Sequence, residues 1–246
     1  MNQKDTSNET VSTDVLLNYD KSFDKKHNLA LMAGFHSEYY HFKEIKAYRQ
    51  NFPSNDLGDI NAGSEAGMKN EGYTRELAML SWFGRVNYDY MGKYLFEANF
   101  RYDGSSRFAK NNRWGLFPSF SAGWRISEES FMQSLSESIS NLKLRASWGK
   151  LGNQSAISGD YYPTIPTITL KDKGYVFNGV IVQGGATQYA KNPHLQWEKS
   201  RTWGIGLDLG IGNDLNVTLD YYDRLTTDII MEVPSPETFG LEKFYD

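Results

Sequence analysis

The sequence predicts an all-β fold, namely a segment of an antiparallel up-and-down transmembrane β-barrel. Three observations predict it: apolar and polar residues alternate with period two, short and long connections alternate along the chain, and aromatic residues gather near strand ends. A wall with one face in lipid and one in water has a low average hydropathy, and the mean hydropathy here is -0.58. No stretch approaches the roughly 18 consecutive apolar residues that a membrane helix requires.

The composition of the 246 residues excludes several other classes of protein. The formal net charge is -4 and there is no basic patch of the kind that phosphate backbones need, so we expect no nucleic-acid partner. Cysteine is absent, which excludes a cysteine nucleophile and cysteine metal ligands. We also expect no metal and no other cofactor, because the four histidines lack ligand-like spacing: His27, His36, His41 and His194.

The two ends of the chain lack features that a complete outer-membrane barrel needs. The first ten residues contain no apolar export signal, and residues 239–246 read as a loop instead of a closing strand. We therefore interpret both ends as cuts. Residues 1–246 are expected to form one partial barrel domain, an open arc of about eight strands from a larger barrel.

The clearest hairpin runs from Leu77 to Gly104 around the turn Met91-Gly92-Lys93. Pairing Tyr90 with Tyr94 places apolar residues opposite apolar residues along both strands, whereas a slip of one residue would oppose them to charges. The pairs that this register predicts further along are Tyr88 with Phe96, Val86 with Ala98, and Trp82 with Tyr102.

The same alternation predicts further strands on both sides of this hairpin. Strands are expected at 116–126 and 142–148, and two weaker ones at 15–20 and 27–36. A last hairpin turns at residues 210–214 and places Trp203, Ile205, Leu207 and Leu209 across from Tyr221, Leu219, Val217 and Leu215.

Connection lengths favour a barrel that crosses a membrane. Short links at 21–26, 91–93 and 210–214 alternate with long ones at 37–74, 105–113 and 153–194. Outer-membrane barrels have short periplasmic turns and long external loops, whereas a soluble sandwich has no reason for this regularity. The intermediate link at 127–141 has apolar residues at helical spacing, which predicts a short helix on the periplasmic side.

Aromatic residues are expected to form two girdles at the bilayer interfaces. Tyr88, Tyr90 and Tyr94 flank one short turn, and Trp124 is predicted at the same level. Trp114 and Trp148 fall toward the long-loop ends. Rings with a polar group settle at such interfaces, although they could also be core aromatics of a sandwich.

Several ordered motifs resemble SusC/RagA-type TonB-linked outer-membrane proteins of Bacteroidetes. The matching segments lie between about Leu77 and Ile230, and the first 75 residues match poorly. The segments are Arg101 to Phe108, Asn111 to Ser119, Gly123 to Glu129, Leu142 to Ser147, Gly152 to Gln154, Asn192 to Glu198, and Asp220 to Tyr222.

The resemblance implies a TonB-dependent receptor, a barrel of about 22 strands with an N-terminal plug. It implies nutrient uptake through the cell outer membrane, with import of oligosaccharides or peptides, TonB as the energy source, and a SusD-like surface lipoprotein as partner. The sequence departs from the family by omission, since plug, TonB-contacting segment and C-terminal strands are not recognised. The substrate therefore stays open.

Two groups of residues are candidates for contact with cargo. Loop aromatics could stack on sugar rings or pack loops together: Tyr39, Tyr40, Tyr161, Tyr162 and Tyr175. Residues expected to face the lumen carry both signs of charge and could form either a hydrated wall or a ligand site: Arg85, Asn87, Glu97, Arg101, Arg125, Arg145 and Asp208.

Two readings from other classes stay open beside the importer. One is a soluble or secreted β-sandwich that binds a ligand, and the other is a hydrolase embedded in a barrel. Ser147-Trp148-Gly149-Lys150 imitates a serine acyl-transfer motif, but Ser147 and Lys150 would face opposite sides of a strand. We therefore predict no catalytic residues and no enzyme.

Overall fold

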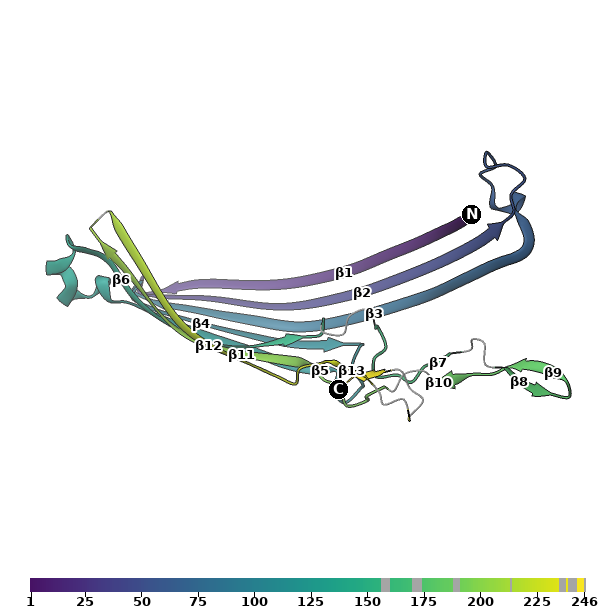
Figure 1. Ribbon diagram of the computed structural model, residues 1–246. Helices are drawn as coiled ribbons and strands as arrows, with labels where there is room; N and C mark the ends of the chain where they lie inside the picture. Colours follow the sequence, from purple (N-terminus) through teal and green to yellow (C-terminus); the bar gives the residue numbers. More distant parts are fainter. Residues whose placement is uncertain are drawn as a thin grey trace.

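The computed structural model describes residues 1–155, 160–169, 174–187, 191–212, 214–234, 238 and 243–245. Its main element is one eight-stranded antiparallel sheet in the order β1-β2-β3-β4-β5-β6-β11-β12 (Figure 1). The strands are β1 (Asn2–Phe23), β2 (His27–Gln50), β3 (Ser64–Tyr90), β4 (Tyr94–Ser105), β5 (Trp114–Arg125), β6 (Ile139–Asn153), β11 (Glu198–Ile211) and β12 (Leu215–Thr227).

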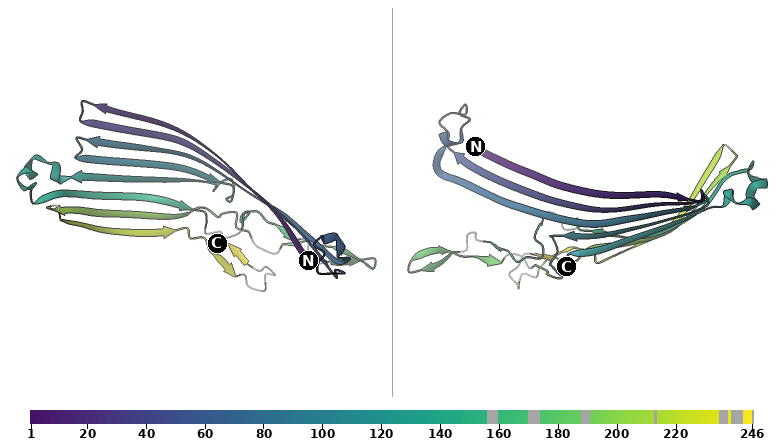
Figure 2. Two further views of the ribbon diagram at one scale, coloured as in Figure 1. Left: turned by 90° about the horizontal axis from the view of Figure 1, so that it is seen from above. Right: turned by 180° about the vertical axis from the view of Figure 1, so that it is seen from behind.

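The sheet is an up-and-down arc, as predicted. Neighbours in sequence are neighbours in space, and the ribbon curves without folding back on itself (Figures 1 and 2). Within this sheet, and among the described residues, β1 pairs only with β2 and β12 only with β11. The sheet is therefore open at both edges. No helix in the described part of the chain is long and apolar enough to cross a membrane.

One face of the sheet exposes large apolar side chains, which explains the alternation in the sequence. Trp82 is 58% exposed, Leu116 54% and Leu219 61%, although each lies within a strand. The predicted register of β3 and β4 is confirmed, with Tyr90 opposite Tyr94 and Trp82 opposite Tyr102. An apolar surface of this extent needs an apolar surrounding, and a second sheet does not cover it among the described residues.

The first three strands are much longer than predicted. The segment expected as a long connection at 37–74 is mostly strand, with only residues 51–63 and the short η1 (Ile60–Ala62) between β2 and β3. These extensions carry polar residues on both faces, so the period-two signal is lost there. The ladder of β1, β2 and β3 continues nonetheless, and Glu44 accepts ion pairs from Lys4 at 2.7 Å and Lys46 at 2.8 Å within it.

The last hairpin pairs two residues out of the predicted register. Ile205 lies opposite Tyr221, Leu207 opposite Leu219, and Ile211 opposite Leu215. The strand continues through Ile211, so the turn begins only at Gly212, whose φ of +55° suits a residue without a Cβ. A shift of two residues leaves each side chain on its predicted face.

The link after β5 is helical but not an α-helix. It forms two 3-10 helices, η2 (Ile126–Glu128) and η3 (Ser130–Leu135), at the end of the sheet where the short turns lie (Figure 1). At the other end, the connection between β6 and β11 holds the small pairs β7 (Ile168–Thr169) with β10 (Ala186–Thr187), and β8 (Gly174–Phe177) with β9 (Val180–Gln183). After β12, β13 (Glu232–Pro234) pairs with β14 (Lys243–Tyr245).

A small apolar core lies where the long loops meet the sheet. It contains Phe108, Phe117, Leu195, Trp197 and Ile230, each at most 7% exposed. The indole N–H of Trp197 donates to the carbonyl of Arg113 at 2.9 Å, and the Asn112 amide donates to the carbonyl of His194 at 3.0 Å. Motifs that are far apart in the sequence therefore meet here to fix the loops.

Candidate functional site

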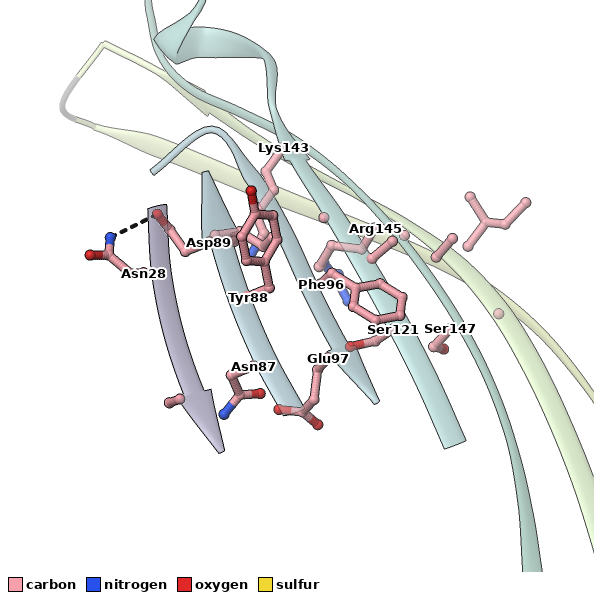
Figure 3. Close-up of a pocket in the computed structure, with 18 of the residues that line it drawn as sticks. Asn28, Asn87, Tyr88, Asp89, Phe96, Glu97, Ser121, Lys143, Arg145 and Ser147 are labelled. Atoms are coloured by element: carbon pink, nitrogen blue, oxygen red, sulfur yellow. Dashed lines mark hydrogen bonds between the residues drawn. The ribbon is translucent and has the colours of Figure 1, made fainter. Parts of the chain in front are cut away.

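The face opposite the exposed apolar residues carries the predicted lumen side chains. The strand registers put all seven on this one face: Arg85, Asn87, Glu97, Arg101, Arg125, Arg145 and Asp208. A hollow of about 1090 Å³ lies against the sheet, lined mainly by residues of this face. Figure 3 shows Asn87, Glu97, Ser121 and Arg145 around it, contributed by four neighbouring strands.

Arg145 is the centre of a charged cluster that spans three strands. Its guanidinium donates to both carboxylate oxygens of Asp208, at 2.8 and 2.9 Å, and to Asp220 at 3.0 Å. The Thr218 hydroxyl donates to Asp208 at 3.3 Å. A Cβ at Gly206 would collide with Asp220 and Arg145, so the glycine makes room for this cluster.

Further polar side chains on this face are hydrogen-bonded to one another. Arg85 donates to Asn99 at 2.8 Å, and Asn99 in turn donates to Glu97 at 2.7 Å. Arg101 pairs with Asp103 at 3.1 Å. These interactions leave a polar surface of balanced sign, which is the composition of a hydrated wall.

Among the described residues, no three His, Asp or Glu side chains gather in a group able to hold a metal ion.

Four of the predicted loop aromatics come together at the long-loop end of the sheet. Tyr39 and Tyr40 lie in β2 and not in a loop, because β2 is longer than predicted. The ring of Tyr40 stacks on Tyr161 with centroids 5.9 Å apart, and the Tyr39 hydroxyl donates to Glu76 at 2.8 Å. The Tyr162 hydroxyl accepts the backbone N–H of Glu76 at 3.0 Å. The side chain of Tyr175 lies outside the described residues.

Two arginines complete this aromatic cluster. The guanidinium of Arg75 lies 5.5 Å from the ring centroid of Tyr161, and that of Arg107 lies 5.4 Å from it. The cluster ties the loop around residue 161 to β3 beyond the end of β4, where the strand edge would otherwise lack a partner. Contact between these aromatics and a substrate stays a prediction.

Glu129 is a functional candidate that the sequence reasoning missed. Its carboxylate accepts hydrogen bonds from the Tyr94 hydroxyl at 2.7 Å, the Trp124 indole at 3.1 Å and the Lys93 ammonium at 3.1 Å. These donors lower the pKa of Glu129 from 4.5 to about 2. The sequence predicted only a short helix in the link at 127–141, which contains Glu129. One signal could have indicated it. The sequence placed Tyr94 and Trp124 in the same aromatic girdle, and both side chains carry hydrogen-bond donors close to this link.

Comparison with known proteins agrees with this arrangement. The family model described as "TonB dependent receptor-like, beta-barrel" matches residues 2–245. The chain is 37% identical to TonB-dependent receptor P39 of Formosa agariphila, over 91% of this chain and 21% of the relative. It is 40% identical to TonB-dependent receptor SusC of Bacteroides thetaiotaomicron, over 67% of this chain and 16% of the relative. The chain thus spans about a fifth of the length of the curated relatives it matches.

Solved structures give the same answer for the fold. The RagAB peptide transporter superposes with a TM-score of 0.88 and 29% identity, covering 100% of this chain and 26% of that one. The RagAB peptide importer in its "open-open" state superposes with a TM-score of 0.86 and 28% identity. The eight-stranded open sheet is therefore part of a larger barrel, and the chain belongs to the family of TonB-dependent receptor β-barrels of SusC/RagA type, which reside in the outer membrane.

Proposed function

We propose that the chain forms part of the barrel wall of an importer that carries oligosaccharides or peptides across the outer membrane. The observation that carries this proposal is the match of the whole arc to the RagAB peptide transporter, at a TM-score of 0.88. The two faces support it, because an exposed apolar face suits lipid and a hollowed polar face suits an aqueous interior.

The polar face would act as a hydrated guide for cargo. Arg145 pairs with Asp208 and Asp220, and Lys143 lies opposite Asp208 as a second positive charge, so the wall around them presents no strong field of either sign. An uncharged sugar or a peptide of mixed charge could pass such a surface without being held by one ion pair. We assign the seven residues of this face to the lumen on that basis.

The partners of the full-length protein follow from the same proposal. A SusD-like surface lipoprotein would deliver cargo at the long-loop end, and TonB would supply energy from the periplasmic side. RagAB is described as a peptide transporter, which makes a peptide one of the two cargo classes to test. TonB-dependent receptors are transporters, so we assign no catalytic residue.

A β-sandwich is less well supported. Its apolar face would pack on a second sheet about 10 Å away, but the further sheets in the described part of the chain have only two strands each.

The test is an uptake assay with the full-length receptor and its lipoprotein partner in their native membrane. Cells would receive fluorescent mixtures of either oligosaccharides or peptides, in parallel with cells that lack the receptor and cells that lack TonB. We expect one mixture to accumulate only when receptor and TonB are both present. Equal accumulation of both mixtures in receptor-deleted cells would contradict the proposal.

A further inference from the structure

The 3-10 segment after β5 exposes apolar side chains at the short-turn end of the sheet. Phe131 is 63% exposed and Leu135 46%, whereas Met132 between them is buried. A connection of three residues suffices at the turn of residues 91–93, so a long segment is not required merely to reach the neighbouring strand. Phe131 and Leu135 thus present apolar surface that the described residues do not cover, which is suited to contact with an apolar partner.

Glu129 fixes the start of η3 on the apolar side of the sheet. Its carboxylate binds Tyr94 and Trp124, whose rings stack with centroids 6.4 Å apart. Both rings belong to the exposed apolar face, because they lie in register with each other and with Leu144. Their polar atoms point to Glu129, so this carboxylate sits at the rim of the apolar surface.

Glu128, the preceding residue, contacts the polar face of the sheet at the same end. It accepts a hydrogen bond at 2.7 Å from Arg125, which belongs to the polar face and also donates to the carbonyl of Gly92 at 3.2 Å. The chain thus crosses from the polar to the apolar side between Glu128 and Glu129. The segment that follows, η3, starts from the apolar side.

We propose that η3 is an interfacial anchor that inserts Phe131 and Leu135 into the periplasmic leaflet of the outer membrane. We infer that lipid is the partner of these side chains because η3 adjoins the apolar face of the sheet. It starts at Tyr94 and Trp124 of that face, and the nearest apolar surrounding for its exposed side chains is the same leaflet. Lys93 forms an ion pair with Glu129, so the contact between Glu129 and the two aromatic residues leaves no unpaired carboxylate at the lipid surface. This inference rests on the membrane placement in the proposed function.

The test measures the depth of spin labels in the full-length receptor, reconstituted in phosphatidylethanolamine–phosphatidylglycerol vesicles. Labels would be attached at Phe131→Cys, at Leu144→Cys as a reference on the lipid face, and at Glu137→Cys as an exposed polar reference, with any other cysteines replaced. Collision rates with oxygen, which concentrates in lipid, and with a water-soluble nickel chelate would be compared at each site.

We expect the label at Phe131→Cys to collide preferentially with oxygen, like that at Leu144→Cys, and the label at Glu137→Cys to prefer the chelate. Adding Glu129→Ala should raise the collision rate of the Phe131→Cys label with the chelate relative to oxygen, because the contact of Glu129 with Tyr94 and Trp124 is lost. An aqueous pattern at Phe131→Cys beside a lipid pattern at Leu144→Cys would overturn the anchor alone. A label at Phe131→Cys shielded from both reagents would mean that protein covers the segment, and would also overturn it. An aqueous pattern at Leu144→Cys would overturn the membrane placement itself.

Discussion

Two neighbouring residues of β6, Ala146 and Ser147, allow the assignment of the two faces to be tested at one depth. Both side chains are exposed, and they point to opposite sides of the sheet. Ala146 lies opposite Ile205 and Ala122 on the apolar face, whereas Ser147 lies opposite Gly204 and Ser121 on the polar face. Arginine at either position adds the same side chain to the same strand.

The expected cost follows from the depth of Ala146 in the bilayer. Its partner Ile205 lies six residues before the end of β11 at Ile211. At about 3.3 Å per residue and a tilt of about 40°, this puts Ala146 roughly 15 Å above the turn, near the centre of an apolar band about 25 Å tall. Ala146→Arg should therefore cost about 2–4 kcal/mol, or roughly 30- to 700-fold in the folding equilibrium.

Ser147→Arg should destabilise the fold much less, because Ser147 lines the hollow on the polar face and both opposing residues, Gly204 and Ser121, are small. The assay is a urea titration of the full-length receptor refolding into lipid vesicles, with the wild type and both variants measured in parallel. A larger penalty for Ser147→Arg than for Ala146→Arg would show that the two faces have been assigned the wrong way round.

Three further predictions concern the charged cluster, the loop core and the rim. Asp208→Asn removes half of the paired contact with Arg145, but Asp220 still binds that guanidinium, so the same urea titration should give a smaller loss than Ala146→Arg; a larger loss would contradict a hydrated wall. Gly152→Ala should lower the free energy of unfolding by about 1–3 kcal/mol, because the added Cβ would collide with the buried Phe117. Gly58→Ala should leave it nearly unchanged, because no atom lies within 4 Å of the added Cβ. Equal urea midpoints for the two variants would refute a packed loop core. The wild type should be more stable than Glu129→Gln, and this difference should be complete above pH 4.5 and disappear as the pH falls toward about 2, because folding lowers the pKa of Glu129. A difference that persists unchanged at pH 2 would contradict the hydrogen bonds that Glu129 accepts from Tyr94 and Trp124.

The part of the fold that sequence reasoning captured is the part with two chemically different faces. In β3 and β4, a slip of one residue would move Trp82 and Phe100 from the apolar to the polar face, so the register was predictable. In the last hairpin, a slip of two residues keeps every side chain on its face. The pattern therefore predicted the faces correctly and the pairing wrongly.

The part that could not be predicted lacks this contrast. The outer halves of β1, β2 and β3 carry polar residues on both faces, and backbone pairing, ion pairs such as Lys4 with Glu44 and the aromatic cluster around Tyr161 hold them. The candidate site divides in the same way. The alternation of side chains along each strand was enough to put Arg145 and Asp208 on one face. The contacts of Tyr161 and Glu129 depend on connecting segments that only the three-dimensional fold brings to the sheet.

We propose that this arc is a section of a lipid-embedded barrel wall with the polar face inward. The most direct measurement is a cryo-EM structure of the full-length receptor in a lipid nanodisc. We predict that both open edges, at β1 and β12, pair with further strands, that Trp82 and Leu219 contact lipid, and that Arg145 and Asp208 face an enclosed aqueous interior. A structure in which a second sheet packs on Trp82 and Leu219, with Arg145 on the outer surface, would contradict the account.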